Sequence, residues 1–207
     1  TSPAHSPVHT LNLAGTWQLS DAEGGHTCPM PVPGDVHSAL LAHGAIPDPY
    51  FGANEHVVQW VAHRDWTLRR SFELPAQALI PATGRWLLTL DQVDCLATVR
   101  INGKTVAELE NQFRRHRLDV TDALRPGHNE IELVLHDAFA EANKRHDEHR
   151  FPLPWDFQGD RHAPINLLRK TQCAAGWDWN LSLMPLGVYG DLTLQCVAVA
   201  VVDHITV

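Results

Sequence analysis

Residues 96–109 read Leu-Ala-Thr-Val-Arg-Ile-Asn-Gly-Lys-Thr-Val-Ala-Glu-Leu, and this run carries the clearest local structural signal in the chain. Asn102-Gly103 separates two mostly apolar segments, 96–101 and 105–109. Asn and Gly both tolerate positive φ, so this dipeptide between apolar runs is the strongest short-range signal for a β-hairpin. The sequence therefore predicts two antiparallel strands joined by a tight turn.

Similar strand-like segments lie on both sides of this hairpin. Each is rich in β-branched, aromatic or alternating residues and is bounded by turn-forming Gly, Pro, Asn or Asp. Two other segments carry helix signals. Residues 35–43 have a capping Asp35 and a stop at Gly44, and 139–150 are so highly charged that we expect them on the surface. The further expected strands are 16–19, 65–74, 85–90, 114–120, 130–136 and 187–202.

This order of elements predicts an all-β fold. Six or more strands with one or two short helices, and no alternation of strand and helix, favour an antiparallel β-sandwich over a parallel α/β fold. We expect a jelly roll, which fits one large domain of 207 residues, 44% of them hydrophobic. The long irregular connection 149–170 is typical of the end loops where a sandwich carries binding residues.

Charge and hydropathy argue against several kinds of partner. The formal net charge of -8 is spread along the chain, whereas nucleic-acid and anionic-membrane surfaces need clustered Lys and Arg. The dense basic run 114–117 alternates like a strand with one solvated face, an interpretation we favour over a phosphate site. No apolar stretch approaches the roughly 20 residues needed to span a bilayer. We therefore expect neither nucleic acid nor a membrane as a partner.

The first residues and the cysteines bear on the setting of the protein. Residues 1–9 are polar and Pro-rich and start at Thr1 without an initiator Met, so we expect a disordered segment. Such an opening suits a processed secretory protein or a trimmed piece of a longer chain. The compartment stays unknown, with a periplasmic or secreted location favoured. Free, mostly buried thiols are expected, with one disulfide as the alternative, at the widely spaced Cys28, Cys95, Cys173 and Cys196.

The stretch Gly176-Trp177-Asp178-Trp179-Asn180 is the best candidate for a binding site. In a strand, alternation would place both indoles opposite the carboxylate, whereas in a turn all three side chains can face one ligand. A sugar suits that set, because an indole packs against pyranose C–H groups and a carboxylate accepts hydrogen bonds from hydroxyls. The alternative is that both Trp are core residues and that Asp178 caps a turn.

No complete catalytic set is visible in the sequence. Glycoside hydrolysis needs two carboxyl groups about 5 to 9.5 Å apart. Of the two Asn-Glu dipeptides, Asn129-Glu130 opens a strand after a Pro-Gly turn, and Asn54-Glu55 lies in a loop with no second carboxylate to place opposite it. The fourteen His lack the spacing of a zinc site. We expect no catalytic residue, no metal and no cofactor.

A set of short motifs runs in order along nearly the whole chain: Leu13-Ala-Gly-Thr-Trp17, Val32-Pro-Gly-Asp-Val-His37, Ile46-Pro-Asp-Pro-Tyr50, Asn54-Glu55, Asp65-Trp66, Asn102-Gly103, Asn111-Gln-Phe-Arg-Arg-His-Arg-Leu-Asp-Val-Thr121, Pro126-Gly-His-Asn129, Arg169-Lys170 and Gly176-Trp-Asp-Trp179. Most are weak individually, and the ordered set is specific. Together they resemble the opening of the β-mannosidases of glycoside hydrolase family 2. The chain departs from that pattern at Asn180-Leu181, where relatives usually have Gly-Pro, and at Gly187-Val-Tyr189, where a Gly-Ile-Trp type of segment is usual.

The resemblance implies an N-terminal sugar-binding-like jelly roll of the galactose-binding-domain-like type over residues 10–200. In that family an immunoglobulin-like domain and a TIM barrel follow, so residues 201–207 would begin a linker or strand toward the former. Both catalytic glutamates belong to the barrel, which alone needs about 250 residues. The resemblance therefore implies that this chain, taken alone, is inactive.

The family's Trp-Asp-Trp loop reaches from the N-terminal domain into the active site of the barrel. Carried over, Trp177, Asp178 and Trp179 would contact a terminal β-mannoside, with Asp178 as the hydroxyl acceptor and Arg169 and Asn166 as supporting residues. The parent would be a retaining exo-hydrolase that removes terminal β-D-mannose. Two other functions stay open, namely a free-standing carbohydrate-binding module and a purely structural docking domain.

Overall fold

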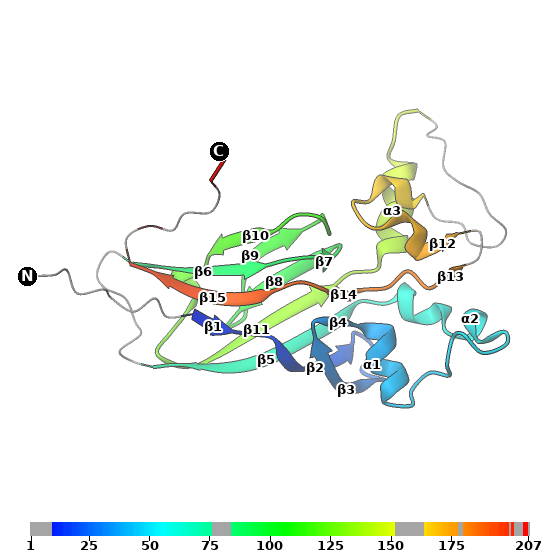
Figure 1. Ribbon diagram of the computed structural model, residues 1–207. Coiled ribbons are helices and arrows are strands. Elements are labelled where there is room, and N and C mark those ends of the chain that lie inside the picture. Colours follow the sequence, from blue (N-terminus) through cyan, green and yellow to red (C-terminus); the bar gives the residue numbers. More distant parts are fainter. Residues whose placement is uncertain are drawn as a thin grey trace, which may run out of the picture.

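The computed structural model describes residues 10–75, 84–151, 164–177, 180–198, 200 and 205–206. Two antiparallel sheets form the body of the domain (Figure 1). The larger sheet has the strand order β3 (Thr27–Val32), β2 (Gly15–Asp21), β5 (Trp66–Leu74), β11 (Gly127–Leu135), β8 (Ala97–Ile101) and β9 (Lys104–Leu109). The smaller sheet has the order β1 (Thr10–Asn12), β15 (Leu192–Val197), β6 (Arg85–Leu90) and β10 (His116–Asp119).

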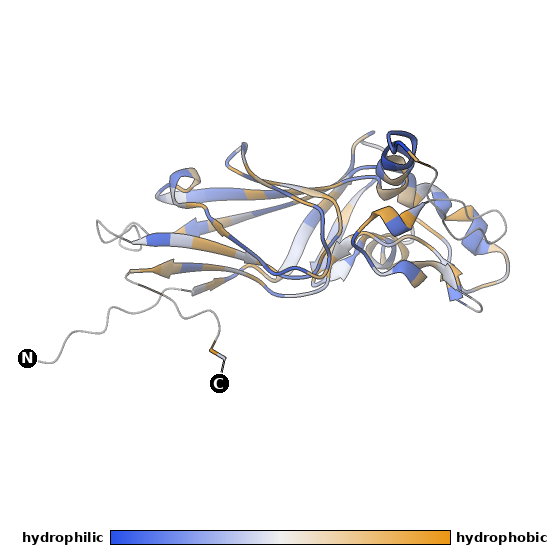
Figure 2. Ribbon diagram, turned by 90° about the horizontal axis from the view of Figure 1, so that it is seen from above, coloured by the Kyte–Doolittle hydropathy of each residue, from blue (hydrophilic) through white to orange (hydrophobic). Residues whose placement is uncertain are grey.

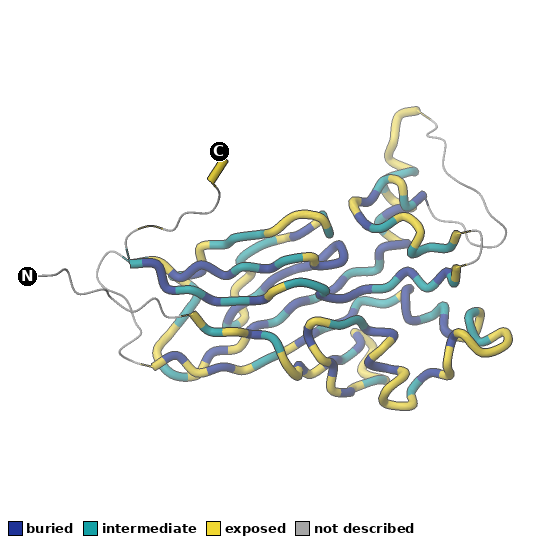
Figure 3. The backbone as a smooth tube through the Cα atoms, in the orientation of Figure 1, coloured by how far each residue is buried: buried dark blue, intermediate teal, exposed yellow. Residues whose placement is uncertain are grey.

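The two sheets share one hydrophobic core. Alternate residues along a strand are buried, as in β11, where Ile131, Leu133 and Leu135 are buried between partly exposed neighbours. Leu88 and Leu194 of the smaller sheet belong to the same core. Hydrophobic and hydrophilic residues are accordingly interspersed along the strands (Figure 2), and buried stretches run through both sheets (Figure 3). The predicted antiparallel sandwich is confirmed.

The predicted hairpin is formed by β8 and β9. Both of its turn residues have positive φ, 51° at Asn102 and 80° at Gly103, as the turn chemistry requires. The Asn102 amide also donates to Asn129 Oδ1 at 2.8 Å, and its oxygen accepts from Glu130 N at 3.0 Å. The turn is therefore fastened to the start of β11, the neighbour of β8 in the sheet.

Helix α1 (Val36–Ala42) begins where the sequence predicts, after Asp35, whose Oδ1 accepts a hydrogen bond from Ser38 N at 2.9 Å. The chain turns out of this helix at Gly44, which has a φ of 72°. The sequence pattern does not predict the next helix, α2 (Asn54–Val57), because its four residues bury no side chain.

Helix α3 (Ala138–Asp147) differs from the expected surface helix. Its first turns bury Phe139 and Ala142 in a second, smaller hydrophobic cluster that also contains Leu168 and Met184. The charged residues therefore cover only one side of the helix, and the other side is apolar. This cluster fastens the segments before and after residue 175 to the sandwich.

The three α-helices found in the described residues lie at one end of the sandwich, on the right of Figure 1. Gly187 lies so close to the backbone of Gly34 and Asp35 there that a Cβ on Gly187 would overlap it, and Gly187 also pairs with Asp94 of a second strand. This approach brings Asp35 and Asp94 to the same place. Two small sheets complete this end: β4 (Gly34–Asp35), β14 (Gly187–Val188) and β7 (Val93–Asp94) in one, and β12 (Ala175–Trp177) and β13 (Asn180–Ser182) in the other.

Several other expectations can be compared with the structure. Cys173 is exposed, and the other three cysteines are buried and unpaired, which confirms free, mostly buried thiols. Within the described ranges, no helix has both the length and the apolar character needed to cross a membrane. The expected disordered segment 1–9 and most of the expected linker 201–207 lie outside the described residues, so these boundaries stay predictions.

Candidate functional site

The Trp-Asp-Trp motif belongs to a short hairpin, β12–β13, in which Trp177 pairs with Asn180. The Trp177 side chain is 53% exposed, in contrast to the fully buried indoles of the two main sheets. Asp178 and Trp179 connect the two strands and lie outside the described residues. The exposure of Trp177 contradicts the alternative in which this Trp is a core residue, and it fits an indole that faces a ligand.

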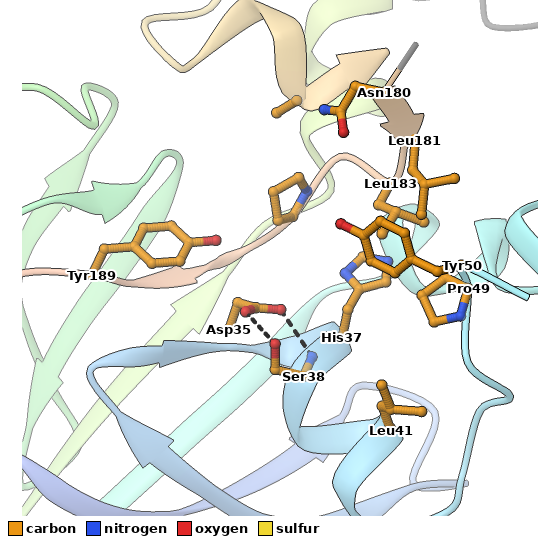
Figure 4. A pocket seen from close by; sticks show the side chains of 12 residues that line it. Asp35, His37, Ser38, Leu41, Pro49, Tyr50, Asn180, Leu181, Leu183 and Tyr189 are labelled. Atoms are coloured by element: carbon orange, nitrogen blue, oxygen red, sulfur yellow. Dashed lines mark hydrogen bonds between the residues drawn. The ribbon is translucent and has the colours of Figure 1, made fainter. Parts of the chain in front are cut away.

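A pocket of about 300 Å³ lies between this hairpin and α1 (Figure 4). That volume is at the lower end of the range found for small-molecule sites. The rings of Tyr50 and Tyr189 enter the pocket from opposite sides, and Leu181 and Leu183 supply apolar surface. The other polar groups of its lining come from Asp35, His37, Ser38 and Asn180.

Asp35 and His37 place one fixed carboxylate and one buried imidazole at this pocket. Both oxygens of Asp35 accept hydrogen bonds from Ser38, from the backbone N at 2.9 Å and from Oγ at 2.7 Å. His37 is only 5% exposed, and neither ring nitrogen has a partner among the described residues. Burial lowers the pKa of His37 to about 4; the Lys170 ammonium adds to this and Asp35 opposes it. His37 is therefore a neutral imidazole at neutral pH.

Lys170 and Asp94 form a buried ion pair close to His37. The Lys170 Nζ to Asp94 Oδ1 distance is 3.0 Å, and the two side chains are 0% and 1% exposed. The same Nζ donates to Pro185 O at 2.9 Å, which ties the chain after the hairpin to strand β7. Burial raises the pKa of Asp94 against the opposing effect of Lys170, and burial likewise raises the pKa of Tyr189, so its phenol keeps its proton.

This arrangement suits recognition of a hydroxyl-rich ligand better than it suits catalysis. Two phenols, a carboxamide and a carboxylate can exchange hydrogen bonds with hydroxyl groups beside an exposed indole. Of the two carboxylates near the pocket, Asp94 is paired with Lys170 and Asp35 accepts hydrogen bonds from Ser38. These two groups therefore do not form the pair of acid and nucleophile that glycoside hydrolysis needs. No three His, Cys, Asp or Glu side chains in the described part of the chain are arranged to hold a metal ion.

The two predicted supporting residues are both exposed. Arg169 pairs with Asn111 in an isolated parallel bridge, and its carbonyl accepts a hydrogen bond from Gln112 N at 2.9 Å. Asn166 lies in a 3-10 turn, Ile165–Leu167. The described contacts of Arg169 are thus made by its backbone, and the buried side chain that braces this segment belongs to its neighbour Lys170.

Sequence reasoning did not single out His37, Lys170 or Glu55 as site residues. Glu55 Oε1 accepts a hydrogen bond from Ser182 N, at the base of the hairpin, at 2.8 Å. All three residues belong to the ordered motifs, which is the one signal that points to them. The spacing of residues could not identify them. An irregular segment has no periodicity, so its sequence does not show which of two adjacent residues, such as Arg169 and Lys170, is buried.

A family model described as "Glycosyl hydrolase 2 galactose-binding domain-like" matches residues 17–190. The chain therefore belongs to this family, and the galactose-binding-domain-like jelly roll that the resemblance implied is confirmed.

The most similar proteins include several β-mannosidases. The β-mannosidase of Rattus norvegicus is 32% identical over 206 residues, which cover 95% of this chain and 22% of the relative. A probable β-mannosidase of Caenorhabditis elegans is 34% identical, over 89% of this chain and 21% of its own length. A solved β-D-mannosidase from Dictyoglomus thermophilum matches with a TM-score of 0.82 and 31% identity, over 90% of this chain and 22% of that one. The chain thus spans about a fifth of the length of these relatives.

Proposed function

We propose that this domain forms one wall of the sugar subsite of a β-mannosidase, a retaining exo-hydrolase acting on terminal β-D-mannose. Trp177, Asp178 and Trp179 contact the mannoside, Asp178 as acceptor of hydroxyl hydrogen bonds, and Arg169 and Asn166 support the loop. The observation that carries the proposal is the 53% exposure of Trp177, whose strand partner Asn180 lines the polar pocket, in a chain whose relatives are β-mannosidases.

Hydrolysis itself belongs, in this proposal, to parts of the parent protein outside the 207 residues. The catalytic carboxyl pair sits in a TIM barrel, and an immunoglobulin-like domain lies between it and this domain, which extends over residues 10–200. The domain alone therefore turns over no substrate. It also binds mannosides weakly, because a wall of a composite site makes only part of the contacts.

The test is Asp178→Ala in the intact parent enzyme, assayed on an aryl β-D-mannoside. We expect kcat/KM to fall by about 100-fold or more, in line with the loss of a hydrogen bond that strengthens in the transition state. Asp122→Ala, an exposed carboxylate on a 3-10 turn elsewhere in the sandwich, is the matched control and should leave turnover unchanged. Unchanged turnover in Asp178→Ala would instead favour a docking domain without a substrate role.

A free-standing carbohydrate-binding module is the second candidate, because the pocket and Trp177 are accessible within this chain itself. Calorimetric titration of the 207-residue chain with mannobiose separates the two functions. A composite site predicts binding no tighter than millimolar. A micromolar dissociation constant would favour the free-standing module.

A further inference from the structure

The hairpin β12–β13 is held from the side by the segment that contains α2. Ser182, the last residue of β13, donates its backbone N–H to Glu55 Oε1 at 2.8 Å, and its carbonyl accepts from Gln59 Nε2 at 2.7 Å. The same Gln59 Nε2 also donates to the carbonyl of Glu55 at 2.8 Å. Both backbone groups of one hairpin residue are thus bound by side chains that lie more than a hundred positions earlier in the chain.

The hairpin depends on this contact because no described strand extends it into a larger sheet. Its strands have three residues each and pair with no third strand among the described elements. A lone two-stranded hairpin is at best marginally stable in water. Ser182 is 2% exposed, so its N–H and C=O need protein partners, and Glu55 and Gln59 supply them.

Another hydrogen bond of Ser182 links its contacts with Glu55 and Gln59 to the position of Trp177. Its Oγ donates to Ala175 O at 2.6 Å across the hairpin, so both strands are fixed at their base. Trp177 lies two residues beyond Ala175 on β12, and residues 178–179 follow directly. A shift of Ser182 therefore moves the strand that carries Trp177, the first residue of the Trp-Asp-Trp motif.

We propose that Glu55 is a positioning residue for the sugar-binding loop, acting on the substrate only through Ser182 and the β12–β13 hairpin. This inference rests on the proposed function of the Trp-Asp-Trp loop. It assigns a role to the Asn54-Glu55 dipeptide, which has no place in the chemistry of hydrolysis. It also predicts that the oxygen of the side chain matters and that its charge is secondary, because the bond to Ser182 needs an acceptor.

The experiment compares Glu55→Ala and Glu55→Gln in the intact parent enzyme, with an aryl β-D-mannoside as substrate. Displacing a binding group by about 1 Å can lower activity about 100-fold, so we expect Glu55→Ala to lower kcat/KM by 10- to 100-fold, largely through a higher KM. Glu55→Gln keeps an acceptor oxygen and should stay within about threefold of the parent. Glu130→Ala removes the exposed carboxylate of the other Asn-Glu dipeptide and should have no effect.

A double variant distinguishes positioning from mere stabilisation. If Glu55 acts through the loop, Glu55→Ala combined with Asp178→Ala loses little more than Asp178→Ala alone, because the loop is already disabled. Unchanged kcat/KM in Glu55→Ala, with a lower Tm only, overturns the inference. So does a Glu55→Gln variant as inactive as Glu55→Ala, since that result assigns the carboxylate a direct role. If Asp178→Ala retains full turnover, the proposed function itself fails, whatever the Glu55 variants do.

Discussion

The β8–β9 and β12–β13 hairpins each have a two-residue connection, but they are supported in different ways. Strand β8 is also paired with β11, so its hairpin forms the edge of a six-stranded sheet over the main core. Among the described strands, β12 and β13 pair with each other and with no third strand, and the side chains of Glu55 and Gln59 hold their base. The first hairpin is fixed by backbone ladders and by burial in the main core. The second is fixed by the small apolar cluster beside α3 and by a few polar contacts between distant segments.

This difference indicates that β8–β9 contributes mainly to the stability of the fold, whereas β12–β13 contributes little to it. The sheet can be stable while the hairpin that we propose to meet the ligand remains a small, locally supported unit. An exposed indole adds little to folding, since it removes little apolar surface from water. Its presence on the less supported hairpin is therefore better explained by a ligand than by stability.

The sharpest test of this contrast truncates one indole of each kind. Trp66 is 0% exposed and its Nε1 donates to Val61 O at 2.8 Å, so Trp66→Ala should lower the free energy of unfolding by about 3–5 kcal/mol. Trp177→Ala should change it by no more than about 0.5 kcal/mol. Urea unfolding of the 207-residue chain measures both values. A loss above about 1 kcal/mol for Trp177→Ala would mean that the β12–β13 hairpin belongs to the core.

The pH dependence of stability tests how the buried His37 at the pocket contributes to folding. The pKa of His37 is about 4 in the folded chain and near its ordinary 6.5 in the unfolded chain. Between these values the unfolded chain binds a proton that the folded chain does not, so stability falls as pH drops from 6.5 toward 4. The expected contribution is about 2 kcal/mol at pH 5 relative to pH 7.5.

His37→Gln isolates that contribution, because Asp35, Asp94 and Lys170 stay in place in both proteins. We expect the variant to lose less unfolding free energy than the parent between pH 7.5 and pH 5, measured by urea unfolding at each pH. Equal losses in the two proteins would show that His37 gains its proton at the same pH whether folded or unfolded.

The supports of the first hairpin could be predicted from sequence, and those of the second could not. Alternation along 130–136 and the Asn102-Gly103 turn specify the strands, the face of the sheet on which each side chain lies, and the register of the hairpin. Asp35 likewise marks the start of α1 as a local cap. The hydrophobic pattern missed the buried side of α3 because only Phe139 and two small Ala residues form it. A charged helix with so few apolar residues is predicted to lie on the surface.

The sequence suggests a candidate site only where the residue types themselves suit a ligand. Two Trp flanking an Asp suit a sugar by their chemistry, and the roles of Trp177, Asp178 and Trp179 stay predictions. By contrast, Glu55 meets Ser182, and Lys170 meets Asp94, across long stretches of chain, and no local rule pairs them. Such contacts depend on how the finished sandwich brings its end segments together. His37 and Glu55 lie within the ordered motifs, which suggests a role for both residues. The motifs do not show which residues they contact.

The smallest expected effect comes from glycines at the two hairpins. Gly103, with a φ of 80° and open space where a Cβ would lie, should lose about 1 kcal/mol of unfolding free energy when replaced by Ala, because the left-handed backbone is strained for L-residues. Gly176 has a φ of 108° on β12, so Gly176→Ala strains the other hairpin. Because that hairpin can open without unfolding the sheets, the loss there is limited to its own local stability and should be smaller. Urea unfolding of the two variants compares them, and a larger loss for Gly176→Ala would show that the hairpin and the sandwich unfold as one unit.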